Sequence, residues 1–280
     1  MKNRSRYAPF VRIIGFVGLL LGSQLLASLA VALVRGRSLL ASGGSFAEID
    51  AQLLELISAH QTELLLISYG IVILVLLLLA RKNRRSLSQY TGLDRKSTPA
   101  LVLLGAVLGL AAAFWTSMAV ALFPWPKVWV SVYEEASSVL TTASPLLDVA
   151  ATVLAGPVIE ELLFRGLIYE AFCAMVPAGA AAIFQGILFG GVHSSPIWMI
   201  YAGAVGCILG YVRKRTDSLR PCIAMHIVFN GSSFLFSWFA EHYGENGTAI
   251  VLAFLGSAAL LLAALFAINR RTAPKAPPAE

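Results

Sequence analysis

The chain is a series of long apolar runs separated by short polar stretches, and this alternation predicts membrane-spanning helices. Eight apolar segments stand out by their length and flanking residues, at 13–34, 64–80, 100–122, 145–164, 174–192, 197–212, 221–239 and 248–268. A spanning helix needs about 20 mainly apolar residues, and several segments approach that length, although the second, fifth and sixth are short. The pattern predicts an all-α polytopic membrane protein, an eight-transmembrane-helix bundle forming a single domain over residues 1–280.

Composition supports a membrane protein and argues against a soluble domain. Hydrophobic residues make up 58% of the chain and charged residues only 13%, with a mean hydropathy of +0.78. The net charge of +6 lies in short clusters between apolar runs, so it does not indicate nucleic-acid binding. Cys173, Cys207 and Cys222 lie in apolar surroundings without CxxC spacing, which predicts buried free thiols. The first apolar segment lacks a convincing cleavage site, so we expect a retained first helix.

The basic residues predict the orientation in the membrane. With an even number of crossings and a cytoplasmic N-terminus, the inside carries Lys2, Arg4, Arg6, Arg81, Lys82, Arg84, Arg85, Arg95, Lys96, Arg213, Lys214, Arg215, Arg270, Arg271 and Lys275. Only Arg35, Arg37 and Lys127 fall outside, so both termini are expected in the cytoplasm, in a bacterial plasma membrane. Arg165 would then snorkel at the cytoplasmic end of the fourth helix. We also expect a short amphipathic helix at 46–58 and a disordered tail at 272–280.

The fourth apolar segment contains two adjacent carboxylates, which are costly in a membrane. A charge at mid-membrane costs about 2.5–3.5 kcal/mol, so an ionisable residue there is a candidate functional residue. Glu161 and Arg165 are four apart, in the acid-before-base order that favours an ion pair on one helical face. Glu160 lies about 100° around the helix. The spacing predicts a structural role for Glu161 and a chemical role for Glu160.

Two further polar clusters interrupt apolar helices. Phe189 and His193 flank Gly190 and Gly191, which would permit close helix approach, and a turn at 193–196 follows. His226 and Asn230 are four apart on one helical face. Taken singly, the histidines could be packing residues, Asn230 an interhelical hydrogen-bond donor, and the Glu–Arg pair a pin for one helix. Taken together, they favour a functional site in an intramembrane polar cavity.

These residues form three short patterns that resemble the motifs of a known family. The patterns EExxxR (Glu160, Glu161, Arg165), FxxxH (Phe189, His193) and HxxxN (His226, Asn230) occur in that order and resemble the three motifs of the CAAX protease and bacteriocin-processing (CPBP, or Abi) family of intramembrane proteases. The resemblance covers roughly residues 150–239, a catalytic core region, and implies endoproteolysis of a membrane-associated peptide or protein. It implies either lipid-anchored CAAX-type or bacteriocin and leader-type substrates, and the lipid bilayer is the other expected partner.

The chemistry of the side chains agrees with hydrolysis. Glu160 is a plausible general base for water, and His193 could position the same water. His226 and Asn230 could stabilise the oxyanion, while Glu161, Arg165 and Phe189 would support the site. We favour this metal-free mechanism without a cofactor.

Three alternatives stay open. Glu160, His193 and His226 could instead bind zinc. A non-catalytic bacteriocin-immunity or membrane binding protein is a second alternative, and a transporter is a third.

One geometric condition accompanies the proteolytic site. From the cytoplasmic helix ends, Glu160 and His226 would lie at depths of about 8–10 Å, whereas His193 would lie about 28 Å along its helix. The three side chains can meet only if the fifth helix is tilted or begins deeper, or if the fourth helix extends past Arg165 toward Glu170. The sequence leaves the oligomeric state undetermined.

Overall fold

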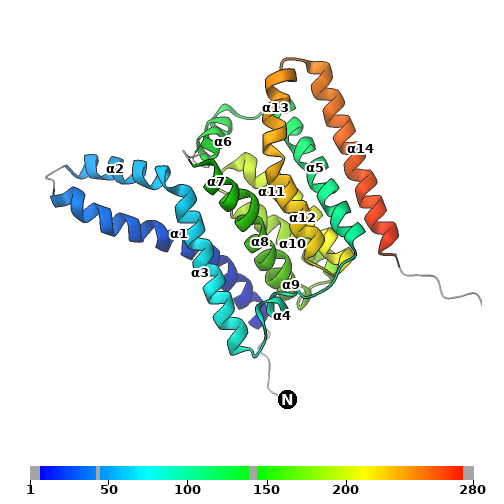
Figure 1. Ribbon diagram of the computed structural model, residues 1–280, viewed down its shortest axis with the longest axis horizontal. Coiled ribbons are helices and arrows are strands. Elements are labelled where there is room, and N and C mark those ends of the chain that lie inside the picture. The colour runs from blue at the N-terminus through cyan, green and yellow to red at the C-terminus, as the bar shows by residue number, and fades with distance from the viewer. Residues whose placement is uncertain (1–6, 42–44, 139–143, 274–280) are drawn as a thin grey trace, which may run out of the picture.

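The computed structural model describes residues 7–41, 45–138 and 144–273, and within these ranges it contains helices and no strand (Figure 1). The proposed tail 272–280 falls mostly outside the described residues. In chain order the helices are α1 (Ala8–Ala41), α2 (Phe46–Ala59), α3 (Gln61–Lys82), α4 (Leu87–Thr91), α5 (Pro99–Leu122), α6 (Lys127–Ser138), α7 (Pro145–Asp148), η1 (Val149–Ala155), α8 (Gly156–Glu161), η2 (Leu162–Ile168), α9 (Tyr169–Cys173), α10 (Ala178–Gly191), α11 (Pro196–Thr216), α12 (Arg220–Gly231), α13 (Ser233–Tyr243) and α14 (Gly247–Arg271).

The elements from α7 to α9 form one continuous helix, which we call the long helix (residues 145–173). The residues at its four junctions all have right-handed helical dihedral angles, and η1 and η2 are π-helical segments within it. The predicted end of the fourth segment at residue 164 was therefore wrong. The helix can continue because neighbouring helices bury the polar side chains near residue 165, so those side chains do not mark a membrane surface.

Other predicted boundaries are confirmed or adjusted. Segments 13–34, 64–80, 100–122, 197–212 and 248–268 lie within α1, α3, α5, α11 and α14. The fifth segment begins at Ala178 instead of residue 174, with Pro177 preceding its first turn. The seventh segment is divided at Ser232 into α12 and α13. The expected helix at 46–58 is α2, which begins with a capping box between Ser45 and Glu48.

The helices confirm an integral membrane protein but not the number of crossings. In the described part of the chain, six helices are long and apolar enough to span a bilayer. These are Ala8–Ser38, Gln61–Lys82, Pro99–Leu122, Pro196–Thr216, Arg220–Tyr243 and Gly247–Arg271, where Arg220–Tyr243 comprises α12 and α13 together. The apolar helix Ala178–Gly191 is shorter. The π-segments divide the long helix into short elements. The total of eight therefore stays a prediction.

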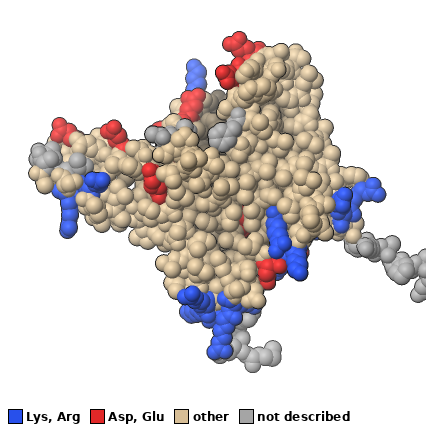
Figure 2. Space-filling model, viewed as in Figure 1, with Lys and Arg blue, Asp and Glu red and all other residues tan. Residues whose placement is uncertain are grey.

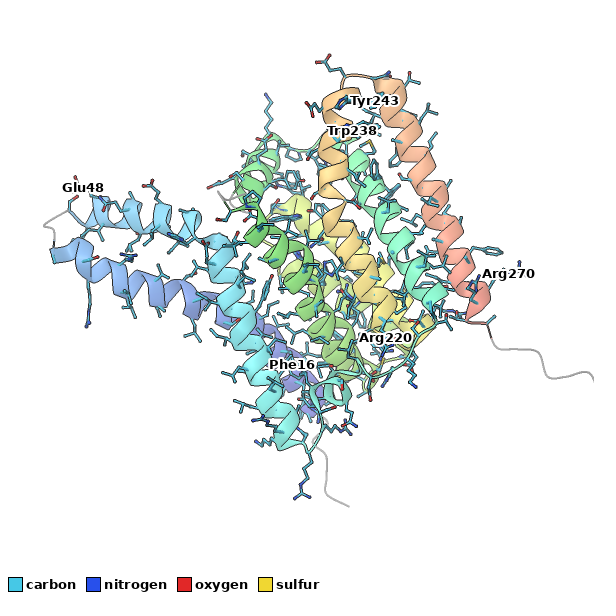
Figure 3. All side chains as sticks on the ribbon, in the orientation of Figure 1. Phe16, Glu48, Arg220, Trp238, Tyr243 and Arg270 are labelled. Atoms are coloured by element: carbon cyan, nitrogen blue, oxygen red, sulfur yellow. The ribbon has the colours of Figure 1, made fainter. Side chains whose placement is uncertain are left out.

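The long helix lies at the centre of the bundle, between α3 and α12 (Figure 1). Helices α1 and α2 pack on the α3 side, and Phe16 of α1 belongs to a buried cluster shared with α3 and the long helix (Figure 3). On the other side, α12 packs on α5, and α5 packs on α14. Helices α10 and α11 form a closely packed pair beside them.

Glycines make two of these helix contacts close. A Cβ added at Gly105 or Gly109 of α5 would collide with the carbonyl oxygens of Pro221 and Met225 in α12. In the α10–α11 pair, a Cβ at Gly190 would collide with the backbone of Met199. The close approach predicted at Gly190 is therefore confirmed, whereas Gly191 faces open space and permits no contact.

All three cysteines are free, but only one of them is fully buried. Cys222 is buried, whereas Cys173 and Cys207 are of intermediate exposure. The prediction of free thiols is confirmed, and the prediction of burial holds for Cys222 alone.

Charged side chains gather at the ends of the bundle. In Figure 2 the largest groups of basic side chains lie at the lower end and lower right, and the largest acidic group stands at the top, while charges of both signs also lie at the left. Figure 3 places Arg220 and Arg270 by the lower ends of α12 and α14, and Tyr243 by the upper end of α13. The cytoplasmic orientation of the termini stays a prediction.

Candidate active site

Glu161 and Arg165 form a fully buried ion pair on the long helix. Arg165 Nη1 donates to Glu161 Oε1 at 2.8 Å, and both side chains have an exposed fraction of 0%. The predicted pair is confirmed. The predicted snorkelling of Arg165 is wrong, because its guanidinium turns into the bundle and the helix continues beyond it to Cys173.

Protein groups replace the water that Arg165 would bind at a membrane surface. Its Nη2 donates to the Gly206 carbonyl at 3.1 Å, and its guanidinium carbon lies 4.4 Å from the centre of the Phe189 ring. Gln185 Nε2 donates to the same Gly206 carbonyl at 2.8 Å. These contacts connect the long helix to α10 and α11, so the buried charge joins three helices.

His226 lies between the two carboxylates. Its Nδ1 is 2.8 Å from Glu161 Oε1, and its Nε2 is 3.7 Å from Glu160 Oε2. An ionised carboxylate that also accepts from Arg165 can only accept from His226, so this network assigns the imidazole proton to Nδ1. In a neutral ring with this tautomer, Nε2 is the acceptor nitrogen, and it is the one that faces Glu160. Glu160 is 21% exposed and Glu161 is 0% exposed, so Glu160 is the more accessible of the two carboxylates.

The length of the long helix lets Glu160 and His193 lie at similar depths, which the sequence analysis required of the site. Measured from Cys173, Glu160 lies about 20 Å along the helix, and His193 lies about 22 Å from the start of α10 at Ala178. Extension of the fourth helix toward Glu170 therefore brings Glu160 to a depth similar to that of His193.

Phe189 stands between the two histidines. Its ring centre is 5.0 Å from that of His193 and 5.7 Å from that of His226, in edge-to-face arrangements. His193 Nδ1 is 2.8 Å from the carbonyl oxygen of Phe189, which leaves Nε2 as its other ring nitrogen. Within the described ranges, no hydrogen bond or ion pair joins His193 to Glu160. The structure thus connects His193 to His226 only through the ring of Phe189, which contacts both histidines.

Asn230 contacts the backbone of the long helix. Its Nδ2 donates to the Thr152 carbonyl at 2.7 Å. In η1 the Gly156 N–H donates to the carbonyl five residues before it, and the next donor in that register would be Pro157, which has no N–H. The Thr152 carbonyl therefore lacks its helical donor, and the Asn230 amide replaces it. His226 and Asn230 both face the long helix, so the predicted common face of their helix is confirmed.

At the second π-segment, η2, Arg213 donates to a main-chain carbonyl that has no helical donor, as Asn230 does at η1. The Tyr169 N–H donates to the carbonyl of Phe164, five residues back, and the return to α-helix leaves the Arg165 carbonyl without a helical donor. Arg213 Nε donates to that carbonyl at 3.1 Å. Its Nη2 binds Glu170 and its Nη1 binds Asp217, both at 2.7 Å.

Arg95 completes this second polar cluster. Its Nη1 contacts Glu170 at 3.0 Å and also contacts Asp217. We refer to Arg95, Glu170, Arg213 and Asp217 as the Arg213 cluster. It joins the chain before α5 to α9 and to the end of α11.

The sequence analysis missed Gln185, Arg213 and the free carbonyls. Gln185 is a lone amide in an apolar segment, and this isolation was a usable signal. Arg213 belongs to a basic run that resembles a topology signal, so the sequence carried no sign of its burial. The free carbonyls depend on π-helical geometry.

The three candidate zinc ligands do not gather in this structure. Among the described residues, no group of three or more His, Cys, Asp and Glu side chains lies close enough to hold a metal ion. A pocket of ≈ 480 Å³ opens between α5, α13 and α14, away from Glu160, and its lining is apolar. A polar cavity at Glu160 stays a prediction.

The chain matches a family of membrane endopeptidases over the segment that carries these residues. Residues 142–232 match the family described as "Type II CAAX prenyl endopeptidase Rce1-like". All three motifs lie within the matched residues, which make up about a third of the chain. The resemblance to the CPBP family is confirmed over this segment.

A curated relative agrees with this result. The chain is 26% identical over 88 residues to the Bacillus subtilis (strain 168) protein named "Putative membrane peptidase YdiL". This alignment covers 31% of the chain and 36% of the relative. No solved structure matches the chain.

Proposed function

We propose that this protein is an intramembrane endopeptidase that cleaves a membrane-associated peptide or protein with water activated by Glu160. The observation that carries this proposal is the position of His226 between two carboxylates, at 2.8 Å from Glu161 and 3.7 Å from Glu160. This contact joins the EExxxR motif, through Glu160 and Glu161, to the HxxxN motif, through His226. Lipid-anchored CAAX-type and leader-type peptides are the proposed substrate classes.

The proposed reaction is a direct hydrolysis. One water molecule can hydrogen-bond to both Glu160 Oε2 and His226 Nε2, because these atoms are 3.7 Å apart. Glu160 takes a proton from this water as its oxygen bonds to the scissile carbonyl carbon. The proton then passes to the amide nitrogen as the C–N bond breaks, which yields a carboxylate and an amine. His193 is proposed to position the water or the substrate.

Glu161 and Arg165 act in this scheme by holding His226. Glu161 accepts a hydrogen bond from His226 Nδ1, which directs the other ring nitrogen, Nε2, toward Glu160. Phe189 packs against both histidines and under Arg165, so it fixes their separation. Asn230 connects α12 to the long helix beside the pair.

The test is a cleavage assay on purified protein in lipid nanodiscs. A library of membrane-anchored peptides, with and without a C-terminal lipid, is incubated with the wild type and with Glu160→Gln. We expect cleavage by the wild type and a loss of at least about 10³-fold in kcat for Glu160→Gln, because this change removes the base. Lys214→Ala, at an exposed position, serves as the control.

The outcomes separate the alternatives. Cleavage that persists in a chelator supports the metal-free mechanism, whereas loss in chelator with recovery on added zinc favours the metal mechanism. Cleavage by Glu160→Gln at the wild-type rate contradicts the proposed base. Substrate binding without cleavage by the wild type favours a non-catalytic membrane binding protein.

A further inference from the structure

Gln185 is a buried amide in the middle of the apolar helix α10. The residue is 0% exposed, and its Nε2 donates to the carbonyl oxygens of Ala182 and Gly206, both at 2.8 Å. An amide nitrogen has two hydrogens, so both are used, and the two carbonyl acceptors establish which end of the side chain is nitrogen. Gln185 therefore fastens α10 to α11 at Gly206.

Arg165 of the long helix reaches the same carbonyl. Its Nη2 donates to the Gly206 oxygen at 3.1 Å, so Gln185 and Arg165 approach one oxygen atom from two different helices. The other contacts of this guanidinium lead into the candidate site. Its Nη1 donates to Glu161, and its carbon lies 4.4 Å from the centre of the Phe189 ring. The orientation of one guanidinium thus affects both the carboxylate that holds His226 and the ring that contacts the two histidines.

The two side chains that meet at Gly206 each keep one buried atom without a hydrogen-bond partner in the part of the chain that the structure describes. Arg165 Nε is a donor and Gln185 Oε1 is an acceptor. Buried polar atoms are nearly always paired, and here each atom is of the type that the other lacks. Gln185 is also held close to α11, because a Cβ added at Gly210 would lie 2.3 Å from its Nε2. Gln185 and Arg165 therefore form one polar unit beside the Glu161 ion pair.

We infer that Gln185 is a positioning residue for the proposed hydrolysis, which fixes the Arg165 guanidinium through the shared Gly206 carbonyl and thereby holds Glu161 against His226. This inference rests on the proposed function and adds to it a residue outside the three motifs. Within the described ranges, Gln185 has no hydrogen bond to Glu160 or to either histidine of the site, so it acts through Arg165. It lies four residues before Phe189, on the same face of α10.

A Gln185 that only joins two helices would behave differently on substitution. Gln185→Met keeps an unbranched side chain of similar length and removes the amide. The loss of an interhelical hydrogen bond lowers Tm in either case. A purely structural role predicts that the protein, once folded, keeps its kcat and the environment of the His226 ring. The positioning role predicts that kcat falls and that the His226 ring changes its environment, while KM stays the same.

The first experiment combines kinetics with nitrogen NMR of isotope-labelled histidine in lipid nanodiscs, with the His226 signals assigned by their loss in His226→Gln. Cys207→Ala is the matched control, because Cys207 Sγ also contacts α10 from α11, at 3.7 Å from the Ile183 carbonyl. For Gln185→Met we expect kcat to fall at least about fivefold, with KM within about twofold and shifted His226 signals. Cys207→Ala should keep kcat within about twofold and the His226 signals unchanged. A smaller fall in kcat for Gln185→Met, or unchanged His226 signals, overturns the positioning role.

A charge swap tests the unit of Gln185 and Arg165 without any cleavage assay. Glu161→Gln leaves the buried Arg165 without a carboxylate, and Gln185→Glu adds a second carboxylate beside it, so each change should lower Tm. In the double variant Arg165 again has one carboxylate, so its Tm should exceed that of both single variants. A Tm at or below that of either single variant overturns the inference and leaves the proposed function intact. Full activity of Glu160→Gln overturns the proposed function itself, and the Tm comparison does not depend on that result.

Discussion

At the scale of single residues, the candidate site is organised by what each ring nitrogen of His226 faces. Nδ1 meets a carboxylate that Arg165 also holds, and Nε2 meets the more exposed Glu160. A buried Glu161 without Arg165 would carry an uncompensated charge, which is strongly unfavourable. The ion pair therefore compensates the charge of Glu161, and the same carboxylate orients the imidazole of His226.

Asn230 gives a residue-scale prediction about stability. Asn230→Ala removes the donor to the Thr152 carbonyl, which has no helical donor because residue 157 is proline. We expect a loss of about 1–2 kcal/mol in the free energy of unfolding, since the carbonyl is left unpaired in apolar surroundings. Denaturant unfolding in detergent micelles measures the change.

A double-mutant cycle provides the control for Asn230. Pro157→Ala returns an N–H to the register that Pro157 interrupts, so Thr152 gains an alternative donor. In that background Asn230→Ala should cost less than about 0.5 kcal/mol. Equal losses in the two backgrounds would show that Asn230 acts through another contact.

At the scale of helices, the Arg213 cluster fixes the end of the long helix against α11 and the chain before α5. Ser218 adds a hydrogen bond to the carbonyl of Arg95 at 2.8 Å. Asp217 occupies a left-handed conformation, with φ 50°, at the end of α11. Aspartate and asparagine tolerate this conformation better than most residues, so the charge of Asp217 can be tested with little backbone strain.

Asp217 predicts how acid affects this connection. Partial burial raises the pKa of Asp217, but hydrogen bonding to Arg213 and the charges of Arg213 and Arg95 outweigh it and lower that pKa from its ordinary value. A lowered pKa in the folded state stabilises the protein above the unfolded-state pKa of about 3.9, and this contribution is lost as pH falls through the folded-state value. We expect Asp217→Asn to lower Tm above about pH 4 and to flatten the acid side of the Tm–pH curve.

Thermal unfolding in detergent between about pH 3 and pH 7 measures this effect. Asp94→Asn is a comparison from the loop between α4 and α5, and its Tm–pH curve should match that of the wild type. A parallel downward shift of the Asp217→Asn curve at all pH values would contradict the charge argument.

The positions of helices were predictable where apolar length alone sets them. The ends of helices were not predictable where polar groups are buried. The runs within α1, α3, α5, α11 and α14 were predicted correctly because lipid-facing helices must be apolar over most of their length. The long helix was ended too early because Arg165 has the sequence appearance of a membrane boundary. Its burial depends on Gly206 and Phe189, which are distant in the chain.

At the scale of the whole molecule, the distribution of charge separates the two ends of the bundle. Arg81 and Lys82 lie in the last turn of α3, and Arg270 and Arg271 lie in the last turn of α14. Glu241 and Glu245 lie by the turn between α13 and α14. In Figure 1 the end of α3 and this turn lie at opposite ends. This arrangement supports the proposed orientation with the end of α3 in the cytoplasm.

Cysteine labelling tests that orientation. In a background with Cys173, Cys207 and Cys222 replaced by alanine, Lys82→Cys and Glu245→Cys are each exposed. A membrane-impermeant maleimide applied to intact cells should label Glu245→Cys and leave Lys82→Cys unlabelled until the cells are lysed. Labelling of Lys82→Cys in intact cells would reverse the orientation.

The same scale shows how much of the site the sequence could give. The motif spacing proposed Glu160, Glu161, Arg165, His226 and Asn230 as candidates, and the structure brings these side chains together on the long helix and α12. Arg213 could not be found this way, because it belongs to a basic run and only the packing of α11 against the long helix reveals its hydrogen bond to the Arg165 carbonyl.

The two carbonyls left over by the π-segments make the attachment of the long helix one-sided. Thr152 and Arg165 contribute main-chain oxygens, which no amino-acid substitution can delete, whereas Asn230 and Arg213 contribute side chains. Genetic damage to these two attachments must therefore arise mainly in α12 and α11. A random mutational survey of the long helix alone would miss these two attachments.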